Sequence, residues 1–298
     1  MWAIWASDSP RSNMNTIKLQ SLISTGAPAV QVMPSHHRSS GHHDHDFYEL
    51  VYVTEGYCLH HVNGLSTLLM EGDCFILPPG VVHAYSGNRV TRIYNCVFDR
   101  SVVEEYLPRL QKLPGLDSLF DGAARHSFLR LHLDLSQRKF FLRRIAFMEE
   151  LCQKKPVGWE LQLSAELICL LTEYSRVCST LGEGVTGENF YPSYVRQAFP
   201  IIDAEYANCD LTVHRIATLV GVSDDHLTRQ FKQVTGITTQ EYLRRYRFAR
   251  AMDLLQAGCP VAQAAKQSGF RTLSYFSREF TKELGISPSK YKNQSNQI

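Results

Sequence analysis

The chain has 298 residues, of which 44% are hydrophobic and 20% charged, a normal composition for a globular protein of about two domains. Disordered and fibrous proteins are therefore excluded. The longest apolar runs, such as Leu167 to Leu171, are far below the ~18 residues needed to cross a bilayer. The first residues lack a basic flank followed by a sustained apolar region, so we expect a protein that is not exported. The eight cysteines form no CxxC pair, which predicts reduced thiols. We therefore expect a cytoplasmic protein without a membrane partner.

The charge is distributed unevenly along the chain. Residues 1–192 carry 17 Lys and Arg against 20 Asp and Glu, whereas residues 193–298 carry 14 against 9. Ten of the twelve histidines lie before residue 193. This asymmetry predicts that the two parts perform different chemistry, with the basic part at the C-terminal end.

Residues 47–98 consist of short β-branched and aromatic runs separated by Gly, Asn and Pro, which is typical of antiparallel strands. We expect a β-barrel or sandwich here. At its beginning, His43, His45 and Glu49 occupy alternate positions. A single strand through all three would direct them to one face, where His83 could join them from another strand.

The spacing of these residues resembles the two motifs of the cupin fold. The first motif reads HxHxxxE and, after six residues, Gly; the second reads Gly, five residues, and PxGxxH. In metal-binding cupins such positions hold Fe, Mn, Zn or Ni. The resemblance implies as candidate metal ligands His43, His45, Glu49 and His83.

A helical region follows the predicted strands from about Leu135. Leu163, Leu167, Leu170 and Tyr174 recur at steps of four, three and four residues, so they form one apolar stripe of a helix. We expect two helices here and a homodimer formed through the striped helix. Packing of the stripe on its own barrel is the alternative.

A segment rich in Gly, Thr and Ser, Thr180 to Ser193, has no periodic apolar pattern and indicates a linker. It divides the chain into a first domain at 1–180, a linker at 181–193 and a second domain at 194–298.

The second domain contains an internal repeat. Ala217 to Gly221 matches Ala265 to Gly269 at an offset of 48, and further matches follow at an offset of 49. Each copy has the small Ala, the turn Gly and the capping residue of a helix-turn-helix, with Ser223 and Thr272 as the expected caps.

The second helix of each copy should expose a polar face that reads DNA. Arginine can bridge guanine O6 and N7, and short polar side chains can contact neighbouring base edges. The candidate DNA-binding residues are Asp225, Thr228, Arg229 and Lys232 in the first copy and Ser274, Ser277 and Arg278 in the second.

Residues from about 194 to 292 resemble the DNA-binding domain of the AraC/XylS family of transcription regulators. The stretch from Gly269 to Lys292, GFRTLSYFSREFTKELGISPSKYK, is close to the signature of that family. The resemblance implies activation or repression at promoter DNA, usually as a dimer, with RNA polymerase and a small-molecule effector as further partners. The segment from Ile93 to Leu133 resembles rhamnose-type regulators of the family.

The expected fold class is therefore α+β and multidomain. A cupin-like β-barrel with two following helices precedes an all-α domain with two helix-turn-helix units. Sensor domains of this family keep the cupin skeleton to bind a sugar or another small effector without metal. The candidate effector-binding residues are His45, Glu49, His83, Tyr48, Tyr52 and Tyr85. Other histidines, including His60 and His61, are expected on the surface or in loops.

Two functions fit this organisation. The first is a sequence-specific, ligand-responsive transcription regulator that senses a sugar, uses no cofactor and is not an enzyme. The alternative is a metallo-cupin enzyme fused to a DNA-binding domain, with a transition metal held by the candidate ligands.

Overall fold

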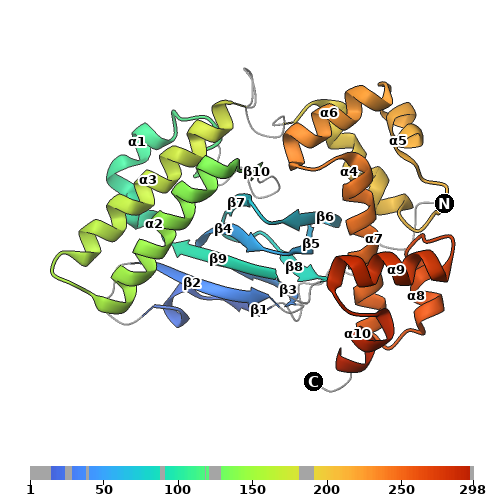
Figure 1. Ribbon diagram of the computed structural model, residues 1–298. Helices are drawn as coiled ribbons and strands as arrows, with labels where there is room; N and C mark the ends of the chain where they lie inside the picture. The colour runs from blue at the N-terminus through green and yellow to red at the C-terminus, as the bar shows by residue number, and fades with distance from the viewer. Residues whose placement is uncertain are drawn as a thin grey trace.

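The computed structural model describes residues 15–23, 29–37, 40–87, 91–117, 119–120, 129–180 and 191–295. Figure 1 shows two β-sheets at the centre, helices α1 to α3 on one side and helices α4 to α10 on the other. Within the described ranges, no helix has both the length and the apolar composition needed to cross a membrane. The predicted linker 181–193 lies largely outside the described residues.

The N-terminal domain is built from two five-stranded sheets. Their strand orders are β1-β3-β8-β5-β6 and β10-β7-β4-β9-β2. The strands are β1 (Asn15–Ile17), β2 (Val30–His37), β3 (Ser40–His45), β4 (Tyr48–Glu55), β5 (Tyr57–Val62), β6 (Leu65–Met70), β7 (Asp73–Leu77), β8 (His83–Ser86), β9 (Thr91–Phe98) and β10 (Arg130–His132).

The two sheets face each other and enclose a common core. Val51, Phe75 and Ile93 from one sheet pack with Cys58 and Tyr85 from the other. Because side chains alternate along each strand, the intervening residues point outward to whatever covers the sheet. The predicted β-rich, cupin-like domain is confirmed, in the form of a two-sheet sandwich.

Helices cover the outer face of the sheet that contains β4, β7 and β9. They are the 3-10 segment Arg100–Tyr106, α1 (Leu107–Leu110), α2 (Leu135–Lys154) and α3 (Trp159–Ser179). The apolar stripe of α3, from Leu163 to Tyr174, is buried here against its own domain. This stripe therefore packs on its own sheet, which leaves only the other faces of the helix for a dimer contact.

The C-terminal domain is entirely helical and contains both helix-turn-helix units. Its helices are α4 (Ser193–Glu205), α5 (Val213–Val220), α6 (Asp224–Thr235), α7 (Thr239–Gln256), α8 (Val261–Gln267), α9 (Leu273–Leu284) and α10 (Pro288–Ser295). The predicted caps are confirmed, since the Ser223 and Thr272 side chains accept hydrogen bonds from backbone N–H groups of α6 and α9. Gly221 ends α5 at φ +77°, a conformation that suits glycine at this turn.

The C-terminal domain packs on the outer face of the other sheet. Leu59, Leu68 and Met70 from β5 and β6 belong to the same apolar cluster as the core of the helical domain. The backbone N–H of Leu68 donates to the Tyr242 hydroxyl of α7 at 2.7 Å. The two domains therefore share one continuous core across this contact.

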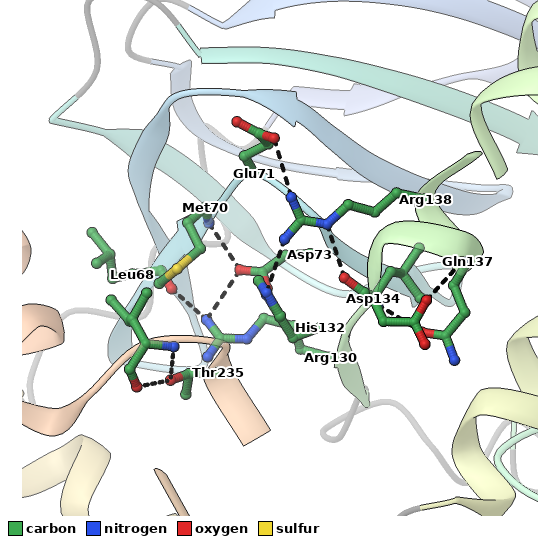
Figure 2. Close-up of polar contacts among 12 residues, drawn as sticks. Leu68, Met70, Glu71, Asp73, Arg130, His132, Asp134, Gln137, Arg138 and Thr235 are labelled. Carbon is green, nitrogen blue, oxygen red and sulfur yellow. Dashed lines mark hydrogen bonds and ion pairs between the residues drawn. The ribbon is translucent and has the colours of Figure 1, made fainter. Parts of the chain in front are cut away.

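A buried ion pair lies at the edge of this contact (Figure 2). Arg130 of β10 lies 3.9 Å from Asp73 of β7 and donates to the Leu68 carbonyl, and its guanidinium lies 5.5 Å from the ring centre of Phe199 in α4. Asp73 also accepts from the Met70 N–H and pairs with His132 at 2.9 Å. Each partner thus has the hydrogen bonds that a buried charge requires.

We predict that Arg130→Ala lowers the free energy of unfolding by about 3–5 kcal/mol, because it removes the guanidinium that pairs with the buried Asp73 carboxylate. Urea unfolding followed by circular dichroism measures this loss. Arg271→Ala is the control, since it breaks an exposed ion pair with Asp210 and should cost only about 0–1 kcal/mol. Equal losses in the two variants would contradict the assignment.

Candidate effector site and DNA-binding face

His45 and Glu49 reach the core between the sheets from two different strands. The predicted single strand through residues 43–49 is wrong, because the chain bends at Asp46 and Phe47 between β3 and β4. The two strands belong to different sheets, so His45 and Glu49 meet face to face across the sandwich. His83 of β8 completes the group: both imidazole Nε2 atoms lie 3.6–3.7 Å from one carboxylate oxygen of Glu49.

The backbone orients both imidazoles. His45 Nδ1 lies 2.7 Å from the Phe47 carbonyl and His83 Nδ1 lies 3.2 Å from the Val81 carbonyl. A carbonyl only accepts hydrogen bonds, so each Nδ1 carries the proton and donates. In the neutral imidazole, Nε2 then presents a lone pair toward Glu49.

Burial sets the charge of the group. His45, Glu49 and His83 are at most 7% exposed. Burial lowers the pKa of His45 to about 4, which keeps its imidazole neutral near pH 7. Burial also raises the pKa of Glu49 to about 7, although a hydrogen bond from the Asn95 side chain opposes the rise. Near neutral pH the group therefore consists of hydrogen-bond acceptors around a carboxyl that gains or loses a proton.

The three side chains have the geometry of a cation site. One donor atom from each of His45, Glu49 and His83 lies within 4.8 Å of the others. The buried Nε2 of His45 has no hydrogen-bond partner among the described residues. Imidazoles whose Nδ1–H groups donate to backbone carbonyls are typical metal ligands, so the residues fit a transition metal. His43, the fourth predicted ligand, packs its ring 4.3 Å from that of His83 but is not part of this group.

Two of the predicted effector contacts lie on the opposite side of their sheet. Tyr48 and Tyr52 are separated from Glu49 by odd numbers of positions on β4, so they point outward into the core beneath the helices. Tyr48 packs on Phe98 and Tyr52 on Phe141. The expectation that they contact an effector is therefore corrected. Tyr85 does lie with the histidines, in an edge contact with His83 at 5.7 Å.

Two residues of this group were missed from the sequence. His60, expected at the surface, is fully buried and stacks on Tyr85 at 4.8 Å, beside His83. Asn95 of β9 reaches Glu49 from the same face of its sheet. The alternation of β5, with Cys58 and Val62 inside, could have placed His60 in the core. We call the six residues the interior polar cluster: His45, Glu49, His60, His83, Tyr85 and Asn95.

The predicted DNA-reading residues of the first unit lie on the side of α6 away from its core. Leu227 and Phe231 are buried, whereas Asp225, Arg229 and Lys232 are exposed and Thr228 is half-buried. Arg229 lies 3.2 Å from His226 Nδ1. The basic end of this face is thus presented to solvent on a regular helix.

The second unit presents a matching face on α9. Ser274 and Arg278 are exposed and Ser277 is half-buried, while Phe276 and Phe280 anchor the helix. The Arg278 guanidinium lies 5.4 Å from the ring centre of Tyr275. Tyr275, which is 44% exposed, was not predicted, although its place one turn before Arg278 on the same helical face was a readable signal.

Comparison with protein families matches both domains. Residues 32–152 match the family of AraC-like ligand binding domains, and residues 216–294 match a helix-turn-helix domain. The chain is 27% identical over 263 residues to the HTH-type transcriptional activator RhaR of Salmonella typhi and 26% identical to that of Salmonella arizonae. These alignments cover 86% of this chain and 88% of each relative.

Solved structures also align with the chain. The C-terminal domain of AraT, a response regulator from Geobacillus stearothermophilus, is 33% identical with a TM-score of 0.34, and the alignment covers 35% of this chain and 86% of that one. Apo ToxT from Vibrio cholerae is 14% identical with a TM-score of 0.36, over 89% of this chain and 97% of that one.

The raised pKa of Glu49 predicts a pH-dependent stability in protein freed of metal by EDTA. Between pH 4.5 and about 7 the unfolded chain has released this proton while the folded chain retains it, so the contribution of Glu49 to stability falls as pH rises. Glu49→Gln removes this fall. The free energy of unfolding of Glu49→Gln, relative to that of the wild type, should therefore increase by up to about 3 kcal/mol from pH 5 to pH 8.

Urea unfolding at a series of pH values measures the difference between the two proteins. Glu55→Gln, at an exposed ion pair with Arg92, controls for the loss of one carboxylate. A constant difference between Glu49→Gln and wild type across this range would refute the assigned protonation of Glu49.

Proposed function

Because this chain belongs to the AraC family of transcription regulators and is a ligand-responsive DNA-binding protein, we propose that its effector binds at the interior polar cluster. The effector class that we propose is a sugar or a related hydroxyl-rich molecule. Sensing, rather than catalysis, is then the role of the N-terminal domain, and the C-terminal helices deliver the output at promoter DNA.

One observation carries this proposal: the lone pairs of the His45 and His83 imidazoles converge on the Glu49 carboxylate. The buried Nε2 of His45 has no hydrogen-bond partner among the described residues, and a buried acceptor is stabilised by a partner that donates a hydrogen bond or carries positive charge. Hydroxyl groups of a sugar meet this requirement, and the aromatic ring of Tyr85 lies next to His83. The similarity to RhaR proteins and to rhamnose-type regulators makes deoxyhexoses the first sugars to test.

A bound cation is a second candidate for the same group. The close approach of one donor atom each from His45, Glu49 and His83 supports it, and such a metal would supply a positive charge that an effector oxygen could coordinate. The metal-free sensor remains our leading proposal, because a DNA-binding output requires ligand recognition and not turnover.

For DNA, we propose that α6 and α9 enter the major groove. The side chains that would contact base edges or phosphates are Asp225, Thr228, Arg229, Lys232, Ser274, Ser277 and Arg278. Their common placement on two exposed helix faces supports this assignment.

We further propose that the protein acts as a homodimer in the cytoplasm, together with RNA polymerase. The eight free cysteines suit a reducing compartment. Since the stripe of α3 is buried, the dimer contact would use the outer faces of α2 and α3, where Leu142 and Leu161 are exposed. Light scattering that shows only monomers at tens of micromolar would refute the dimer.

We predict that Arg229→Ala and Arg278→Ala each weaken binding to a fragment selected from random duplex DNA by about 1–3 kcal/mol, the value of a bidentate contact to guanine. Electrophoretic shift titrations measure the affinity, and repeated selection measures the base preference. Lys154→Ala, which removes a charge from α2 in the sensor domain, is the control. A uniform loss without altered base preference would indicate phosphate contacts instead.

We predict that Glu49→Ala abolishes the response of DNA affinity to the sugar while the sugar-independent affinity remains. A thermal-shift screen of L-rhamnose and related sugars supplies the ligand, and shift titrations with and without it give the response. Tyr48→Phe is the matched control, because Tyr48 lies on the outward face of the same strand.

Chelation separates the two candidates for the site. A metal-free sensor keeps its response after EDTA, with elemental analysis showing no stoichiometric metal. Loss of the response in EDTA and its return with added metal would favour the cation. A full response in Glu49→Ala would refute the interior polar cluster as the effector site.

A further inference from the structure

Strands β5 and β8 have one face in the interior polar cluster and the other at the C-terminal domain. On β5, His60 points inward and its neighbour His61 points outward; on β8, Tyr85 points inward and Ser86 outward. Adjacent residues of the same strands therefore contact the candidate effector site and the DNA-binding domain.

The outward residues form a chain of hydrogen bonds that begins and ends on α7. The Ser86 hydroxyl donates to Asp253 at 2.9 Å, so it must accept from Nε2–H of His61, which lies 2.7 Å away. His61 Nδ1 then accepts from the Ser66 hydroxyl at 2.9 Å. Burial lowers the pKa of His61 to about 4, in keeping with this neutral imidazole.

Arg250 closes the chain on the other side. Its guanidinium donates to the Ser66 hydroxyl at 2.9 Å and pairs with Asp203 of α4 at 3.0 Å. The Asp203 carboxylate also accepts from the Ser66 backbone N–H at 3.1 Å. Helices α4 and α7 are thus both bonded to the outer face of β5, β6 and β8. We call this set the interdomain hydrogen-bond chain: His61, Ser66, Ser86, Asp203, Arg250 and Asp253.

The end of β8 also approaches α7 closely. The Gly87 N–H donates to Asp253, and a Cβ added at Gly87 would lie 2.8 Å from the Ala249 carbonyl oxygen. Backbone from both domains therefore meets here without room for a methyl group. A displacement of β8 would therefore change its packing against α7 directly.

The strand β8 is equally tied to the candidate site. It pairs with β3, which carries His45, on one side and with β5 on the other. The pairing with β3 contains a register shift between Ser40 and His43, next to the His43–His83 pair. Such irregularities re-aim side chains and are frequent near binding sites.

We propose that β5 and β8 couple the effector site to the DNA-binding domain. An effector that moves His60, His83 or Tyr85 shifts the backbone of these strands and so changes the geometry of the interdomain hydrogen-bond chain. The docking of α4 and α7, and with them the two DNA-reading helices, then differs between the effector-bound and effector-free protein. This inference rests on the proposed function, because it takes the interior polar cluster as the effector site.

Thermodynamic reciprocity gives the proposal a test that needs neither effector nor DNA. If the two faces are coupled, a change on the inner face must alter the docking of α7, and a change at the docking contact must alter the strands of the cluster. Hydrogen exchange of backbone amides, followed by mass spectrometry on the full chain, reports both effects in separate peptides.

Two variants act on the inner face and two on the outer. His60→Leu and Tyr85→Phe should raise exchange in α7 by about fivefold or more relative to α3. Gly87→Ala and Asp253→Asn should raise exchange to a similar extent in β3, which lies beyond β8 from the C-terminal domain.

Matched controls separate the effect of disturbing the contact between β8 and α7 from the general effect of each amino-acid change. Gly64→Ala introduces the same unfavourable positive φ as Gly87→Ala, but a Cβ at Gly64 meets nothing within 4 Å. Asp210→Asn removes a carboxylate whose ion pair with Arg271 lies within the C-terminal domain. Both controls should leave exchange in β3 unchanged. If His60→Leu also raises exchange in the reference helix α3, the test of coupling rests on Tyr85→Phe, which deletes only a hydroxyl.

Increased exchange on the far side in both directions would support the coupling. Increases confined to the substituted side, in either direction, would overturn it. These outcomes are separate from those of the proposed function. If the exchange experiments show coupling but no sugar binds, only the proposal of a sugar effector is refuted. If the sugar response survives in Asp253→Asn and Gly87→Ala, only the proposed coupling is refuted.

Discussion

The two-residue period of the β-strands is the constraint on which the functional organisation of this protein depends. It places Glu49 of β4 inside the sandwich and Tyr48 outside it, and on β5 it separates His60 from His61 in the same way. Because neighbouring side chains must point to opposite faces, a thin sheet carries ligand chemistry on one surface and a domain contact on the other. The proposed effector site and the DNA-binding domain are therefore separated by a single layer of backbone.

The chemistry inside the sandwich follows from desolvation. Burial keeps the His45 imidazole neutral and holds the Glu49 carboxyl near its protonation midpoint at neutral pH. Backbone carbonyls occupy the Nδ1–H groups of both histidines, so the remaining lone pairs face the carboxyl. Such a group is stabilised by anything that brings donors or positive charge. This explains why the same geometry fits either a hydroxyl-rich ligand or a metal ion.

The contact between the domains combines an apolar core with charged groups at its margins. Leu59 and Leu68 join the core of the helical domain, while Arg130 with Asp73 and Arg250 with Asp203 are ion pairs near its edges. Apolar burial supplies affinity without direction, and the ion pairs and hydrogen bonds fix one register of docking. The reading faces of α6 and α9 remain exposed in this arrangement. Docking of the C-terminal domain therefore determines the position of these two helix faces but does not cover them.

The sequence by itself determined the two domains, the helix-turn-helix repeat with its caps at Ser223 and Thr272, and the His45, Glu49 and His83 set. The helix-turn-helix features are local, because caps, turn glycines and apolar periodicity depend on residues a few positions apart. The His45, Glu49 and His83 set followed from the resemblance of its spacing to the cupin motifs. Only the tertiary structure decided which face each strand presents, because the break at Asp46 and Phe47 resets the alternation between β3 and β4. For the same reason Tyr48 and Tyr52 lie outside. The inward position of His60 follows instead from the alternation of β5, in which Cys58 and Val62 also point inside. The burial of the α3 stripe and the contact of Ser86 with α7 likewise join segments far apart in the chain, where no local pattern records the pairing.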